Sequence, residues 1–332
     1  MKTNILKISA LCASLSILAS SANAQIVGFN VTDTNPTPTS NISMVENSSS
    51  AVYGVRAQNP YASYLTSVSV KVDVTNTGTG TVYGVGNVGS GAGASAITIS
   101  NDIYVSTNGT SATAITGIGA ITLQGDITIS AKSSNAMYSM SMQELRLYSN
   151  GGIHTLFGGL SISNGVIYSG KYIWDSYGSF IYFNMNSGIS ISAGVEIEFM
   201  KSLTTNAALN VYGSLSFHVG DIFSDIMTMT SSYAMTIGSS AQFTLILDYG
   251  FEALTDDSLT LVNGTITGSF DSDNVSIMNS ITGEYLNYGT DFTVSGREVT
   301  FLRDITVIPE PSTYAAIIGV LAFGLAIYRR RK

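Results

Sequence analysis

Residues 51–55 read "AVYGV", and residues 81–85, thirty positions further along the chain, read "TVYGV". A second pair, "AITI" at 96–99 and "AITL" at 120–123, recurs at a spacing of 24. Repeats of about 20 to 30 residues are typical of the coils of a parallel β-helix, where each coil stacks its strands on the previous one. The repeats therefore favour a stack of similar coils over a single irregular sheet.

Between residues 51 and 300, apolar and polar residues alternate with a period of two. Residues 67–74, "SVSVKVDV", show this most strictly, with a valine at every second position. The period indicates half-buried strands, and the scarcity of good helix formers agrees with it. Further stretches of this kind are "DIYVS" (102–106), "DITIS" (126–130), "LSISNG" (160–165), "ISISAG" (189–194) and "LNVYGSLSFHVG" (209–220).

The predicted fold is all-β, with a parallel β-helix as the body of the chain. An antiparallel β-sandwich is the alternative, because it also predicts short strands separated by turn residues. Residues 259–306 carry more acids and clearer turns, "VNGT" at 262–265 and "SGRE" at 295–298. We interpret them as a small β cap, since the end of a solenoid otherwise exposes pairing edges.

The N-terminus has the features of a secretory signal peptide. Two lysines precede an apolar run at residues 8–19, and "SANAQ" places Ala22 and Ala24 where signal peptidase reads small residues. Cleavage is predicted between Ala24 and Gln25. Because Cys12, the single cysteine, lies inside this segment, the mature chain is expected to form no disulfide.

Residues 307–332 read "VIPEPSTYAAIIGVLAFGLAIYRRRK". Residues 312–328 contain no charge, and as a helix they would extend about 25 Å, close to the roughly 30 Å of a hydrocarbon core. A cationic cluster follows them, as expected for the cytoplasmic end of a stop-transfer helix. The cluster consists of Arg329, Arg330, Arg331 and Lys332.

This tail resembles the PEP-CTERM sorting signal of Gram-negative bacteria with extracellular polysaccharide. The matching elements are Pro309-Glu310-Pro311, the apolar span from about Tyr314 to Tyr328, and the terminal arginines. The resemblance implies recognition by exosortase, a membrane enzyme, with delivery to the cell surface or the extracellular matrix. The end of the body, where it runs into this tail, also resembles autotransporter-like passenger proteins.

The sequence thus divides into five segments. They are a signal peptide (1–24), a polar N-terminal or cap segment (25–50), a β-repeat body (51–258), a C-terminal β cap (259–306) and a sorting tail with one transmembrane helix (307–332). Residues 25–308 contain 8 Lys and Arg against 21 Asp and Glu, a net charge of −13. Such a charge argues against nucleic acid as a partner, because phosphates would be repelled.

Few residues suggest chemistry. His154 and His218 lie inside alternating stretches without a motif that supplies a nucleophile, so we interpret both as structural. The sequence has neither the cysteines nor the paired histidines of a zinc site, and no cofactor is predicted. "GSGAGAS" at 89–95 lacks the Lys-Ser/Thr of a phosphate loop.

Carboxylates offer two further candidates. Asp256-Asp257 and Asp271-Ser-Asp273 have oxygens suited to Ca²⁺ but lack the remaining ligands of an EF-hand loop, so solvated turns are the preferred interpretation. Glu196 and Glu198 share one strand face at a spacing close to that of glycosidase carboxylates. A surface role is the preferred interpretation of this pair. A lyase would need a base beside an acidic cluster, and only Arg297, next to Glu298, comes close.

Tyrosines surround the single tryptophan, Trp174: Tyr168, Tyr172 and Tyr177. Aromatic side chains on an exposed face can stack on sugar rings, although core packing is the more common role. The sequence predicts no catalytic or metal-binding residue. It predicts an exported structural or adhesive β protein with signal peptidase, an exosortase-like enzyme and extracellular polysaccharide as partners; the alternative is a β-helical lyase or glycosidase.

Overall fold

The computed structural model describes residues 25–58, 64–88, 96–101, 103–107, 112–116, 120–123, 128–132, 138–147, 153–176, 180–222, 224–230 and 232–308. Ala22 and Ala24 of the predicted signal peptide lie outside these residues, as does the predicted sorting tail from Pro309 to Lys332; Gln25 is the first described residue. Within the described ranges, no helix has the length and apolar character needed to cross a bilayer.

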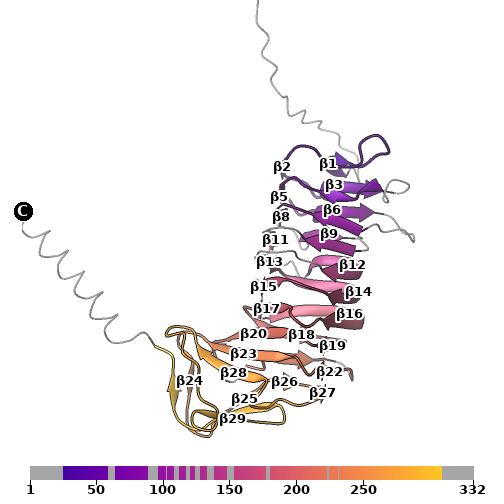
Figure 1. Cartoon of the computed structure of the whole chain (residues 1–332). Helices are drawn as coiled ribbons and strands as arrows, with labels where there is room; N and C mark the ends of the chain where they lie inside the picture. The colour runs from indigo at the N-terminus through magenta and orange to yellow at the C-terminus, as the bar shows by residue number, and fades with distance from the viewer. Residues whose placement is uncertain are drawn as a thin grey trace, which may run out of the picture.

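The described chain is a parallel β-solenoid, in which two long sheets run side by side along an elongated stack (Figure 1). In the first, the order is β1 (Ile26–Asn30), β3 (Val52–Gln58), β6 (Val82–Val88), β9 (Ala112–Thr116), β12 (Tyr138–Leu147), β14 (Gly159–Ile167), β16 (Phe180–Ile191), β18 (Ser202–Thr205), β21 (Met227–Met229) and β26 (Val262–Asn263). Beside its last strands lie β19 (Ala208–Val211), β22 (Ala234–Ile237) and β27 (Thr265–Thr267).

The second sheet has the order β2 (Ile42–Glu46), β5 (Val72–Asn76), β8 (Ile103–Thr107), β11 (Thr128–Lys132), β13 (Ile153–Phe157), β15 (Lys171–Asp175), β17 (Glu196–Phe199), β20 (Ser214–Val219), β23 (Gln242–Leu247) and β28 (Val275–Asn279). A short third sheet contains β4 (Ser67–Val68), β7 (Ala96–Ile99) and β10 (Ala120–Leu123). All pairings in these three sheets are parallel, so the antiparallel sandwich is wrong and the β-helix prediction is confirmed.

The sequence repeats predict the register only in part. Val52 lies opposite Val82 and Ala96 opposite Ala120, as their spacings of 30 and 24 require. "DIYVS" and "DITIS" are also similar at a spacing of 24, but their register differs from that spacing by two positions, because Ile103 lies opposite Ile129. A shift of two leaves the same residues facing inward, so the pattern cannot detect it. "LSISNG" and "ISISAG" are not aligned residue for residue either, since Gly165 lies opposite Ile189, the first residue of the second stretch.

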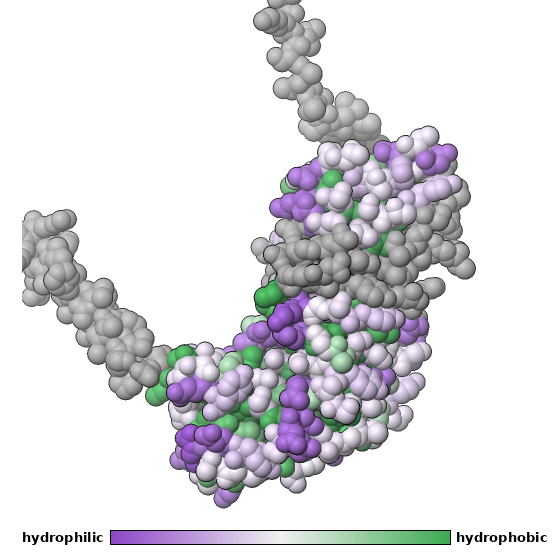
Figure 2. Space-filling view, in the orientation of Figure 1, coloured by the Kyte–Doolittle hydropathy of each residue, from purple (hydrophilic) through white to green (hydrophobic). Residues whose placement is uncertain are grey.

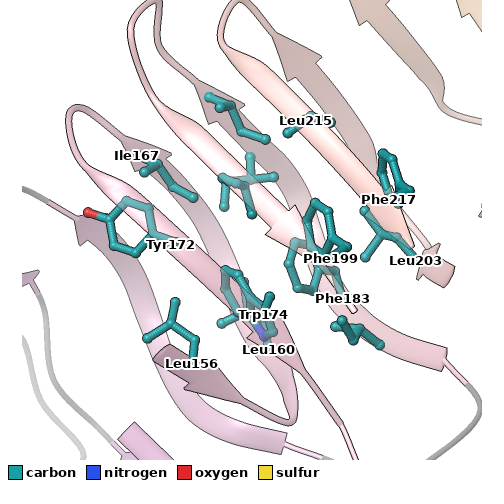
Figure 3. Close-up of a cluster of buried hydrophobic side chains, with 14 of the residues drawn as sticks. Leu156, Leu160, Ile167, Tyr172, Trp174, Phe183, Phe199, Leu203, Leu215 and Phe217 are labelled. Atoms are coloured by element: carbon teal, nitrogen blue, oxygen red, sulfur yellow. The ribbon is translucent and has the colours of Figure 1, made fainter. Parts of the chain in front are cut away.

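Alternate residues of each strand form one continuous core between the sheets. Figure 3 shows part of it, with Trp174, Phe199 and Phe217 from successive coils stacked in a column. The ring centroids of Trp174 and Phe199 are 6.2 Å apart, and those of Phe199 and Phe217 are 5.0 Å apart. Phe183 packs on Trp174 from the opposite sheet at 4.7 Å. The Trp174 indole N–H donates to the Gly158 carbonyl at 2.6 Å, so burial leaves no polar atom of this side chain unpaired.

Among the described residues, a few buried strand positions carry polar side chains, including Asn76, Thr107 and Thr205. Asn76, at the end of β5, is 1% exposed. Its amide oxygen accepts from the N–H groups of Ser48 and Gly78, and its amide nitrogen donates to the carbonyls of Ser48 and Gly80, all within 3.0 Å. A Cβ at Gly80 would lie 1.9 Å from the Ser50 carbonyl oxygen, which explains the glycine. Asn76 therefore fixes the corner of its own coil and that of the preceding one.

The boundaries of the solenoid differ from those expected. It begins within 25–50, because β1 and β2 already pair with β3 and β5. It continues past residue 259, because β26 and β27 extend the first sheet in parallel. "VNGT" at 262–265 is therefore not a hairpin turn: it joins two strands that pair with separate neighbours in the previous coil.

A small antiparallel unit follows and lies at the C-terminal end of the stack (Figure 1). It contains β24 (Glu252–Ala253), β25 (Ser258–Thr260), β29 (Phe292–Ser295), β30 (Glu298–Phe301) and β31 (Ile305–Thr306). "SGRE" at 295–298 makes the β29–β30 hairpin, with Gly296 at φ 64°. Residues 284–286 cover the free edge of β28, with Tyr285 bridging Met278.

Candidate functional site

The outer faces of the solenoid are polar but weakly so. Figure 2 shows mainly pale surface on the described stack, the colour of residues such as Ser, Thr and Gly, with strongly hydrophilic residues gathered in patches. Ionisable side chains are scarce enough that any cluster of them stands out. The most connected cluster lies on the outer face of the second sheet.

This cluster contains Glu198 on β17, His218 on β20 and Asp248 directly after β23. His218 Nε2 lies 2.8 Å from a Glu198 carboxylate oxygen, and His218 Nδ1 lies 2.8 Å from an Asp248 carboxylate oxygen. The strands β17, β20 and β23 are consecutive neighbours, so one imidazole connects three coils. We call these three residues the imidazole cluster.

The geometry determines the charge of His218. Its partial burial lowers its pKa, but the hydrogen bonds to Glu198 and Asp248 and the attraction of both carboxylates outweigh burial, so its pKa is raised above 6.5. With a carboxylate at each ring nitrogen, the geometry favours the imidazolium, in which both nitrogens donate, at any pH below the raised pKa. His218 therefore has no free nitrogen with which to act as a general base.

A cavity of about 250 Å³ adjoins the cluster. Its lining includes Lys201, Phe217, His218, Asp221, Asp225 and Asp248. The Asp225 carboxylate accepts from the Asn263 amide at 2.8 Å, so this carboxylate also connects elements of different coils. The volume lies below the roughly 300–1,000 Å³ of pockets that enclose drug-sized ligands.

Glu196 and Glu198 do not act as a pair in the structure. Glu196 forms an exposed ion pair with Lys171, which lies opposite it on β15, at 2.7 Å. Glu198 bonds to His218 instead, and neither glutamate lines the adjoining cavity. The two carboxylates thus have different cationic partners, Lys171 in the preceding coil and His218 in the following one.

The acidic turns considered for Ca²⁺ are satisfied by the chain itself. An Asp271 carboxylate oxygen accepts from the Asp273 N–H at 2.9 Å, and Asp257 accepts from the Leu254 N–H at 2.7 Å. Asp256 adopts a positive φ of 71° in its turn. Within the described ranges, no three His, Cys, Asp or Glu side chains are grouped so that they could hold a metal ion.

The remaining candidates fall in different places. Tyr172 and Trp174 are buried in the core, whereas Tyr168 is 40% exposed, and Tyr177 lies outside the described residues. The backbone of His154 lies in β13 opposite Tyr172. Arg297 donates to the Gly264 carbonyl and does not join an acidic cluster.

Sequence reasoning considered Glu198 and His218 separately and missed Asp248. Each partner lies two residues beyond the position directly opposite in register. Glu198 lies opposite Ser216 but bonds to His218. His218 lies opposite Ile246 but bonds to Asp248. Such diagonal contacts can be identified only when the strand register is known.

The imidazole cluster predicts a pH-dependent stability. Because the folded-state pKa of His218 exceeds its unfolded value, its contribution is complete below about pH 6.5 and is lost as the pH rises through the raised pKa. We expect the melting temperature to fall as the pH rises from about 6.5 through the raised pKa of His218. In the double variant Glu198→Gln/Asp248→Asn, we expect a shallower fall.

Thermal unfolding followed by circular dichroism between about pH 6 and 9 would measure both slopes. Lys171→Gln, which breaks the exposed Lys171–Glu196 pair, serves as a control and should keep the slope of the parent protein. Equal slopes for the parent and the double variant would contradict the assigned charge of His218.

Comparisons of the chain with protein-family models, with curated proteins and with solved structures found no match.

Proposed function

We propose that this protein is an exported structural or adhesive β-solenoid of the cell surface or extracellular matrix, and that it is not an enzyme. The observation that carries the proposal is how the outer polar side chains are used. They bond across coils: Glu198 to His218, Asn206 to Asn184 at 2.6 Å, and Thr244 to Ser276 at 3.0 Å. Side chains used in this way stiffen a rod and leave its faces available for contact with a matrix.

The proposed route of export follows from the two ends of the sequence. The signal peptide would direct the chain through the inner membrane, with cleavage after Ala24. The apolar span and the cluster from Arg329 to Lys332 would hold the chain in the membrane while an exosortase-like enzyme recognises Pro309-Glu310-Pro311. We thus propose one extracellular protein, whose solenoid lies at the cell surface in association with polysaccharide.

Replacement of Pro309-Glu310-Pro311 by three alanines tests this route. We expect the variant to accumulate in the membrane fraction at the size of the signal-cleaved precursor, because the exosortase-like enzyme would lose its extended recognition segment. Cell fractionation with immunoblotting measures this result. Replacement of Asp304 by Asn, in the exposed segment just before the tail, is the matched control and should leave delivery unchanged. Normal processing of the triple variant would exclude the exosortase route.

A second candidate function, an enzyme acting on polysaccharide, is favoured by the cavity beside His218, because its lining brings Asp221, Asp225 and Asp248 together. The test is an incubation of the protein with neutral and acidic polysaccharides, followed by assays for new reducing ends and for the ultraviolet absorbance of unsaturated products. We expect neither signal. If the parent protein released such products and Asp248→Asn did not, the enzymatic proposal would replace the structural one.

A further inference from the structure

A second cavity of about 250 Å³ lies between the end of β28 and the antiparallel unit. Three segments form it: the turn that follows β28, residues 284–291, and residues 303–306 around β31. Its lining includes Asn279, Glu284, Tyr285, Asn287, Asp291 and Arg303. We call it the cap pocket.

An arginine is held in place at the cap pocket by a buried carboxylate. Asp291 is 7% exposed, and it accepts from Arg303 Nε at 2.7 Å and from the Asn287 N–H at 2.7 Å. The hydrogen bond from Arg303, followed by that from Asn287, lowers the pKa of Asp291 below 3.8, so the pair stays charged at neutral pH. Arg303 has five N–H donors; Nε uses one on Asp291, and Nη1 donates to the Asp304 carbonyl at 3.5 Å. Its side chain is 59% exposed, so other donors can reach a ligand.

An aromatic ring stands at the same pocket on a fixed backbone. Tyr285 is 60% exposed, although its main chain forms a β-bridge with Met278. The next residue, Leu286, is also fixed, because its N–H donates to the Ile277 carbonyl. Asn279 is also fixed, because its side-chain oxygen accepts from the N–H groups of Ile281 and Thr282. Its amide N–H₂ keeps its donors for a ligand. The pocket therefore combines a flat apolar face with donors that are already oriented.

We infer that the cap pocket binds one neutral sugar unit of a polysaccharide, with Tyr285 against the ring and Arg303 and Asn279 donating to hydroxyl oxygens. The inference rests on the proposed function, since it names the site and the ligand class of an adhesive protein. Hydroxyl groups match the donors, and the C–H face of a sugar matches the tyrosine ring. The volume accommodates a small unit rather than a long segment.

Charge favours a neutral sugar over an acidic one. The Asp291 carboxylate is balanced by Arg303, but Glu284 adds a second negative charge to the lining. The body also carries a net charge of −13, which repels a polyanion at long range. A uronic acid polymer is therefore disfavoured at this pocket.

Affinity electrophoresis of the full chain tests the inference, with dextran and galactomannan in the gel as neutral probes and polygalacturonate as the acidic probe. We expect at least one neutral polymer to retard the protein and polygalacturonate to have no effect. Tyr285→Ala should weaken that binding by about tenfold, the size of one lost aromatic contact. Arg303→Lys, which keeps the charge beside Asp291 but loses the planar fork of donors, should also weaken it.

Tyr249→Ala is the matched control, because Tyr249 is 65% exposed and does not line the cap pocket. It should bind as the parent does, and all variants should keep the parent melting temperature within about 3 °C. The inference would be overturned if both neutral polymers failed to retard the protein, or if Tyr285→Ala bound as tightly as the parent. Neither outcome bears on the Pro309-Glu310-Pro311 experiment, so failure of the sugar site and failure of the export proposal can be distinguished.

Discussion

Trp174→Ala is expected to destabilise the protein by about 3–5 kcal/mol, the cost typical of removing a large buried aromatic side chain. Trp174 is fully buried between Phe199 in the next coil and Phe183 in the opposite sheet. Its removal would open a cavity in the centre of the column and leave the Gly158 carbonyl without the indole donor. Because each coil contacts only its neighbours, the loss would weaken the stack on both sides.

Urea unfolding followed by circular dichroism measures the change in the free energy of unfolding. Trp174→Phe should cost less than the alanine variant, since it keeps a ring in the column and removes only the indole N–H and part of the volume. Phe180→Ala is the exposed control from the neighbouring coil; Phe180 is 49% exposed, and a change within about 0.5 kcal/mol is expected. A similar cost at Trp174 and Phe180 would show that the aromatic column does not stabilise the solenoid.

Asn76→Ala is expected to cost about 2–4 kcal/mol, although it removes only a small polar side chain. The backbone N–H groups of Ser48 and Gly78 would lose their acceptor in a corner where Asn76 itself is 1% exposed. The carbonyls of Ser48 and Gly80 would lose one donor each but keep the Gly80 N–H and the Thr107 hydroxyl, respectively. Each unsatisfied buried group costs about 1–3 kcal/mol, reduced where the corner can admit water. The same urea titration measures the loss.

Asn76→Asp separates the two halves of this network. The aspartate would keep the acceptor for the Ser48 and Gly78 N–H groups but would place a second oxygen against the carbonyls of Ser48 and Gly80. It should therefore also destabilise the protein, whereas Thr75→Ala, on the outer face of the same strand, should have little effect. A neutral result for Asn76→Ala would mean that the corner is held by other contacts.

The sequence could predict which residues face inward but not which residues meet. Trp174, Phe199 and Phe217 lie in one column although they are 25 and 18 positions apart, and Leu245 follows 28 positions later. Coils of unequal length leave no fixed period from which this alignment could be derived. The repeats at 51–55 and 81–85 predict the correct register because the coils there have nearly constant length. Val85 lies opposite Ile115 in the next coil, again thirty positions along the chain.

The same limit applies to the imidazole cluster and the cap pocket. His218 lies 20 positions after Glu198 and 30 positions before Asp248, so no local motif connects them. Asp291 and Arg303 are 12 positions apart across a hairpin whose turn, "SGRE", was recognised, but their pairing depends on the packing of the unit. Asn76, by contrast, continues the inward positions of Val72 and Val74, so its burial could have been predicted.

Cross-linking by paired cysteines tests the parallel stacking of coils most directly. In a Cys12→Ser background, Ser216→Cys/Thr244→Cys places two thiols on directly opposite positions of β20 and β23, within the separation that a disulfide can bridge. We predict rapid formation of this disulfide on mild oxidation, with little from Ser216→Cys/Gln242→Cys, because Gln242 lies opposite Ser214. Preferential cross-linking of the second pair, or of neither pair in the folded protein, would contradict the solenoid on which the account depends.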